Sequence, residues 1–187
     1  MNLLVPLRLS QVIALTGALA TLVVNPWSNY DPISLPKMVV MSGGAISAAA
    51  FLIFNQVTFF ATVDRSTKFA FSVFLIGLMV PMLFSGAPLA QQFWGSFGRN
   101  TGLLTYLSLA SLMFATLVLR STTAYSIILR LFIGTAAPMT AYCLVQYFHK
   151  DPISWSEKFV FGTLGNVNFL SAFICMTSVA FILLGNQ

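Results

Sequence analysis

Six long stretches of this 187-residue sequence contain no charged side chain and no histidine. They cover residues 9–30, 38–63, 69–98, 100–119, 131–148 and 159–187. A helix needs about 20 predominantly apolar residues to cross the hydrocarbon core of a membrane, so each stretch can hold one crossing. The segment 69–84 is apolar on every side, which suits a helix among lipid and other helices better than the alternating strands of a membrane barrel.

The composition points to the same environment. Only 7% of the residues are charged and 58% are hydrophobic, whereas a soluble domain carries about 25% charged residues. The sequence therefore predicts an all-α, polytopic transmembrane helical bundle of about six spans. We expect these spans at residues 9–27, 38–60, 68–86, 102–119, 125–148 and 167–185.

The first predicted span shares features with a cleavable signal peptide. Arg8 precedes an apolar run that contains the small-residue triplet Ala18-Leu19-Ala20. Because the apolar run continues past this triplet to Val24, we favour an uncleaved span.

The connections between the predicted spans alternate in length and composition. The N-terminal segment, the two short connections and the start of the fifth span carry Arg8, Arg65, Lys68, Arg120 and Arg130. The three longer connections carry Lys37, Arg99, Lys150 and Lys158, and each holds one of the three tryptophans. Since basic residues in short loops favour the cytoplasmic side, we expect the N-terminus and the C-terminus in the cytoplasm.

One tetrapeptide occurs in two of the long connections, as residues 31–34 and again as residues 151–154, with the sequence Asp-Pro-Ile-Ser. Asp-Pro favours turn initiation and tryptophan prefers the headgroup region, so both copies suit turns at the membrane interface. The alternative is that these connections form an aromatic-rich surface on which an amphiphilic or sugar-bearing molecule docks.

Polar and helix-breaking residues inside the spans allow two interpretations. Arg130 lies in the fifth span, where its long side chain can reach the interface or mark a functional site. Pro81 and Pro138 kink helices, and Gly43 and Gly44 allow close helix packing. A broken-helix transporter site is the alternative. Against the transporter interpretation, no intramembrane carboxylate is available to couple protons or sodium, because all four acidic residues lie in connections.

The sequence predicts neither a metal site nor a cofactor. His149 is the only histidine, and Cys143 and Cys175 fall inside spans, where thiols behave as small hydrophobes. The net charge of +5 includes no basic run that indicates nucleic-acid binding. Anionic membrane lipid is the partner that these charges predict.

Two of the long connections contain residues suited to binding. Gly98, Arg99 and Asn100 lie in a glycine-rich loop whose backbone amides and arginine fork suit an anion such as phosphate. An ordinary glycine-rich turn is the alternative. Asn166 and Asn168 precede the sixth span, where an asparagine caps a helix well.

These two connections together resemble a family. The motifs are GSFGRNTG at residues 95–102, DPISW at 151–155 and GTLGNVNFLSAF at 162–173. From about residue 88 to residue 173 the chain resembles the O-antigen ligases and the related Wzy-type O-antigen polymerases. The family has a proline between the two asparagines of the last motif, where this chain has Val167.

The resemblance implies a glycosyltransferase of the bacterial inner membrane, active in lipopolysaccharide or cell-surface polysaccharide biosynthesis. Such enzymes move a glycan from a polyprenyl-pyrophosphate carrier at the extracytoplasmic face and use no cofactor. By this resemblance Gly98, Arg99, Asn100, Asn166 and Asn168 bind substrate. Family members carry their catalytic residues on a large extracytoplasmic loop that no segment here matches, so no catalytic residue is assigned.

Residues 1–187 then form a single transmembrane domain, the N-terminal part of a larger ligase-like fold, and we expect no transferase activity from them alone. The alternative is a non-catalytic integral membrane subunit or scaffold that packs against other membrane protein subunits in a larger complex.

Overall fold

The computed structural model describes residues 4–27, 31–55, 61, 63–96, 98–119, 121–153, 155 and 159–185. Within these ranges the regular structure is entirely helical. The helices are α1 (Leu4–Leu22), α2 (Ser34–Phe54), α4 (Arg65–Phe84), α5 (Leu89–Trp94), α6 (Leu103–Val118), α7 (Thr122–Gly134), α8 (Ala136–Tyr147) and α9 (Val167–Gly185).

Five helical segments are long and apolar enough to cross a membrane: Val5–Leu22, Ser34–Phe54, Arg65–Phe84, Thr122–Tyr147 and Val167–Gly185. The sixth crossing corresponds to α6, a shorter apolar helix of 16 residues. At a rise of about 1.5 Å per residue, α6 extends about 24 Å along its axis. The predicted fold class, an all-α bundle of about six membrane spans, is confirmed.

Helix ends differ from the predicted span ends in places, because a charged residue does not end a helix. Arg8 lies inside α1, which begins at Leu4, and Lys37 lies inside α2. The last residues of the predicted span 38–60 fall at 56–60, outside the described residues, as do Arg120 and Lys158 from the topology prediction. The third connection also contains α5, a short helix that the sequence analysis did not predict.

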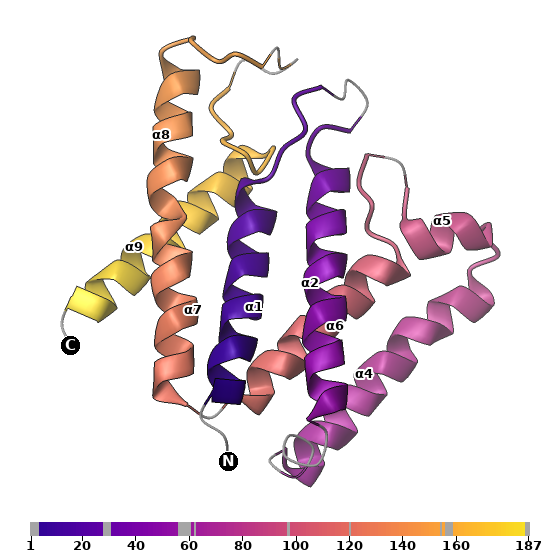
Figure 1. Ribbon diagram of the computed structural model, residues 1–187. Coiled ribbons are helices and arrows are strands. Elements are labelled where there is room, and N and C mark those ends of the chain that lie inside the picture. The colour runs from indigo at the N-terminus through magenta and orange to yellow at the C-terminus, as the bar shows by residue number, and fades with distance from the viewer. Residues whose placement is uncertain are drawn as a thin grey trace.

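The central layer consists of α1 with α2 on one side and α7 on the other, while α6 crosses behind them (Figure 1). The close approach of α1 and α2 depends on Gly44, because a Cβ atom there would lie 2.0 Å from the Thr16 hydroxyl oxygen. Small side chains also line the contact of α2 with α6, where the hydroxyls of Ser42 and Ser108 lie 3.2 Å apart. The Gly44 contact fits the prediction that small residues pack membrane helices closely, whereas for Gly43, which has open space around it, the prediction is wrong.

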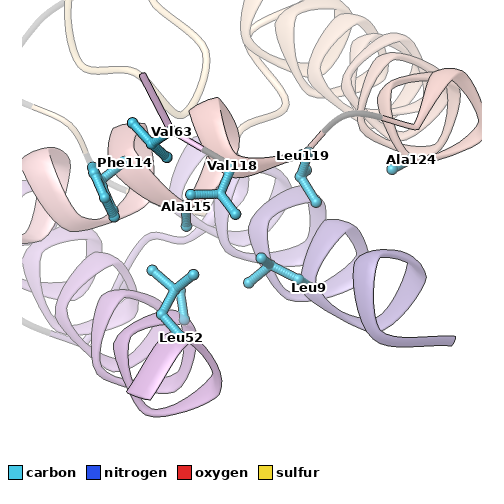
Figure 2. Close-up of a cluster of buried hydrophobic side chains, with 9 residues drawn as sticks. Leu9, Leu52, Val63, Phe114, Ala115, Val118, Leu119 and Ala124 are labelled. Carbon is cyan, nitrogen blue, oxygen red and sulfur yellow. The ribbon is translucent and has the colours of Figure 1, made fainter. Parts of the chain in front are cut away.

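A buried apolar cluster joins α1, α2, α6 and the start of α7 (Figure 2). Leu9 of α1, Leu52 of α2 and Leu119 after α6 meet there, and Leu9 and Leu119 are almost fully enclosed. A second, smaller cluster of Met139, Leu170 and Phe173 joins α8 to α9. The larger cluster therefore holds α1, α2, α6 and the start of α7 together, and the smaller one holds α9 against α8.

The sequence predicts a kink at Pro138, and the structure has an interruption instead, at Thr135 between α7 and α8. Proline has no N–H to donate to the carbonyl four residues earlier, at Gly134, and its ring crowds that carbonyl. The two helices nevertheless continue in nearly the same direction and act as one span (Figure 1).

Candidate functional site

Three connections far apart in sequence meet at one end of the bundle, the upper end in Figure 1. The Ser34 hydroxyl, at the start of α2, donates to the Gly98 carbonyl at 2.8 Å. The Asn100 side chain donates to the carboxylate of Asp31. These two hydrogen bonds hold the loop before α6 against the loop before α2.

The connection between α8 and α9 is fixed to the same end through α1. The Thr163 hydroxyl donates to the Thr21 carbonyl at 2.7 Å. The Lys37 ammonium donates to the Ala20 and Thr21 carbonyls at 2.8 and 3.0 Å. Lys37 therefore satisfies carbonyls at the C-terminal end of α1, where a cation is favoured by the helix dipole.

Glycines close the loop between α5 and α6. Gly102 has no room for a side chain, because a Cβ atom would lie 2.3 Å from the Gly95 nitrogen. Gly98 adopts a left-handed conformation with φ of 82°. The N–H groups of Arg99 and Asn100 donate to the Ser96 carbonyl at 3.1 and 3.0 Å. For these two amides the anion-binding interpretation is wrong, since the loop itself uses them.

A cavity of about 650 Å³ lies between the three connections, and we call it the loop pocket. Its polar lining includes Gly98, Arg99 and Thr101 from one loop, Asp31 from another and Asn166 from the third. Three of the five residues predicted to bind substrate, Gly98, Arg99 and Asn166, therefore line one cavity.

The charged groups of the loop pocket differ in how they are held. The Asp31 carboxylate is 6% exposed and accepts from the Ser34 N–H at 2.8 Å as well as from Asn100. The Arg99 side chain is exposed and donates to no residue that the structure describes. The pocket therefore presents a guanidinium available for an external anion beside a carboxylate whose oxygens already have donors.

The two other predicted residues lie outside the lining of the pocket. Asn100 has φ of 48°, and its side chain bonds to Asp31 while its carbonyl accepts from the Thr105 hydroxyl at 2.6 Å. Asn168 is exposed on the first turn of α9, where its N–H donates to the Asn166 side-chain oxygen at 2.8 Å. The predicted cap of the last span is thus Asn166, which also lines the pocket.

Side chains of α8 hold the last connection in place. The Gln146 side-chain oxygen accepts from the N–H groups of Phe161 and Gly162 at 3.2 and 2.8 Å, and all three residues are buried. The Tyr142 hydroxyl donates to the Asp151 carboxylate at 2.8 Å, and the Trp155 indole N–H lies 2.9 Å from both of these groups.

Sequence reasoning did not assign Asp31, Gln146 or Thr163 to the site. Asp31 had a signal, the repeated Asp-Pro-Ile-Ser tetrapeptide, and both copies of its aspartate do accept a backbone N–H from the residues that follow. Gln146 offered only a weak signal, an amide near the end of an apolar span.

Across the ranges the structure describes, no three His, Cys, Asp or Glu side chains gather in a way that suits a metal ion. The apolar helices define the chain as a multi-pass α-helical membrane protein with a pocket of mixed polar and apolar lining at one end. No family model matches the sequence, and no curated protein or solved structure matches it.

Proposed function

We propose that this chain is the membrane-embedded portion of an O-antigen ligase-like glycosyltransferase and that its loop pocket holds the phosphates of a polyprenyl-pyrophosphate-linked glycan. One observation carries the proposal. The segments 95–102 and 162–173, which bear the family resemblance, contribute Arg99 and Asn166 to the same cavity. Both segments therefore face one cavity, as contact with a single ligand requires.

The residues of the pocket suit the pyrophosphate end of such a carrier. In the transfer, an acceptor hydroxyl attacks the anomeric carbon of the glycan and the bond to pyrophosphate breaks. The departing pyrophosphate gains negative charge, which a fixed cation stabilises. Arg99 can donate two parallel hydrogen bonds to phosphate oxygens. The Asn166 side-chain oxygen accepts from the Asn168 N–H, so the side-chain NH₂ group of Asn166 is left as a donor for the ligand.

The proposal includes a bacterial inner membrane location, with the loop pocket on the extracytoplasmic side and the N-terminus in the cytoplasm. The start of α1, the end of α2, the starts of α4 and α7 and the end of α6 lie at the end of the bundle opposite the pocket (Figure 1). Arg8, Arg65 and Lys68 lie towards that end, beside the short connections, whereas Lys37, Arg99 and Lys150 lie towards the pocket end. Because the positive-inside rule weights short loops, this distribution supports the orientation.

The test compares the affinity of a polyprenyl pyrophosphate for the wild-type protein and for Arg99 variants in lipid nanodiscs. A charge-assisted hydrogen bond contributes about 1.5–3 kcal/mol, or about ten- to a hundred-fold in affinity. We expect Arg99→Lys to bind more weakly than wild type and Arg99→Ala more weakly still. Lys150→Ala is the control, because Lys150 is exposed at the same end but does not line the pocket. Unchanged affinity in a stably folded Arg99→Ala would refute the proposal.

The alternative, a non-catalytic membrane subunit, is favoured by α4, which buries none of its residues and leaves its faces available to neighbours. The two functions separate in one assay. Glycan transfer that depends on Arg99 supports the enzyme, whereas full transfer activity of the assembly containing Arg99→Ala supports the subunit.

A further inference from the structure

A second cavity, of about 550 Å³, lies between α4 and the pair formed by α2 and α6, and we call it the α4 groove. The contact of α2 with α6 is close because small residues such as Ala45, Ala48 and Ala115 are buried in it. On the other side, the bulky side chains of Phe71 and Leu75 line the groove and hold α4 away.

The walls of the α4 groove are apolar. They include Leu52, Phe71 and Phe114, and the rings of the two phenylalanines lie 4.7 Å apart. The hydroxyls of Ser72 and Ser111 also line the groove, but each donates to a helix carbonyl, that of Lys68 at 2.9 Å and that of Ala45 at 3.3 Å. These hydroxyls therefore leave the walls with little hydrogen-bonding capacity.

The polar group that the groove does offer is the Lys68 ammonium. Lys68 lies in the first turn of α4, about 4.5 Å along the helix axis from its first residue. Its side chain is exposed and forms no ion pair with any residue in the described ranges. Where a span enters the membrane, such a side chain extends to the level of the lipid headgroups.

We propose that the α4 groove binds an anionic phospholipid of the surrounding membrane, with one acyl chain along the apolar walls and the phosphate on Lys68. Charge and lining both favour this occupant, because Lys68 supplies a cation at one end of the groove and most of the other lining residues are apolar. A soluble polar ligand would find few partners on these walls. The start of α4, which carries Lys68, lies at the end of the bundle opposite the start of α2 (Figure 1). The two cavities share no lining residue, so the site is distinct from the pocket proposed to hold the glycan carrier.

The test measures lipid binding by native mass spectrometry, with phosphatidylglycerol and phosphatidylcholine of identical acyl chains titrated onto the purified protein. We expect wild type to prefer phosphatidylglycerol. We expect Lys68→Ala to lower the phosphatidylglycerol affinity about five- to tenfold. One lysine near an anionic membrane surface raises the binding constant by about this much. Lys68→Arg keeps the preference, since it keeps the charge. Arg8→Ala also keeps it, because Arg8 is an exposed cation towards the same end that does not line the groove.

A filling substitution tests the apolar part of the site. Ser72→Phe places a ring in the groove from an exposed helix position, and we expect it to weaken binding of both lipids while the thermal stability is kept. An unchanged phosphatidylglycerol preference in Lys68→Ala would overturn the proposal. So would efficient disulfide cross-linking of Ser72→Cys between two copies of the chain, which would show that a second copy covers the groove.

Discussion

The substitution Gln146→Met tests how the last connection is held beside the loop pocket. Methionine has a similar length but no amide oxygen, so the N–H groups of Phe161 and Gly162 lose their acceptor. Both groups are buried, and a buried donor without a partner costs about 1–3 kcal/mol. Methionine also removes the buried Nε2 of Gln146, which has no hydrogen-bond partner within the described residues, and this offsets about one of the two lost bonds. The expected net loss is therefore about 1–3 kcal/mol, limited by the free energy at which this connection opens locally.

The assay combines thermal unfolding in detergent with hydrogen exchange. One kcal/mol shifts Tm by about 2–4 °C in a chain of this size, so we expect Tm to fall by at least about 2 °C. Exchange at residues 161–163 should accelerate, and polyprenyl pyrophosphate binding should weaken because Asn166 follows in the same connection. Gln11→Met is the control, since Gln11 is exposed on α1. A Tm and an exchange pattern equal to wild type would refute the argument.

Three further predictions concern the loops and the helix ends. Gly102→Ala should lower Tm, because the added Cβ would lie 2.3 Å from the Gly95 nitrogen, whereas Gly77→Ala, with open space around it, should raise helix stability by up to about 1 kcal/mol; equal Tm changes would contradict this. The Asp64 carboxylate accepts from the Thr67 hydroxyl and N–H, and these bonds hold its pKa below the ordinary value. Its stabilisation of α4 is therefore present above the unfolded pKa of about 3.9 and is lost as the pH falls through the lower folded pKa, and thermal unfolding across that range should show a smaller acid dependence in Asp64→Asn. A cysteine at Ser96 should react with a membrane-impermeant thiol reagent in intact cells, and cysteines at Ser66 and Ser121 should not; the reverse pattern would invert the proposed orientation.

The fold was largely predictable because a membrane span leaves a coarse signal. Charge-free stretches of sufficient length located the long helices that the structure describes. They could not define the helix ends, since α1 and α2 extend past the charged residues Arg8 and Lys37. Lys37 is tolerated there because its ammonium reaches carbonyls of α1, a tertiary contact that no local pattern contains.

The site was predictable only in part. Gly98, Arg99 and Asn166 were assigned from their loops, and all three line the pocket. Asn100 was given a binding role, but the structure shows its side chain joining its loop to Asp31. The contribution of Asp31 depends on a contact between segments far apart in the chain, and Gln146 acts on backbone amides of a distant loop. The tetrapeptide at Asp31 and the amide of Gln146 are visible in the sequence, but neither indicates the contact that gives the residue its role.

Photoaffinity labelling with a polyprenyl pyrophosphate that carries a photoreactive group beside its phosphates tests the central claim most directly. The loop pocket predicts that labelled peptides come from both of its binding loops, residues 98–101 and 164–169, which line the same cavity. Unlabelled carrier should compete, and Arg99→Ala should reduce labelling of both loops together. Labelling confined to one of these loops, or located in the α4 groove and unaffected by Arg99→Ala, would contradict the account.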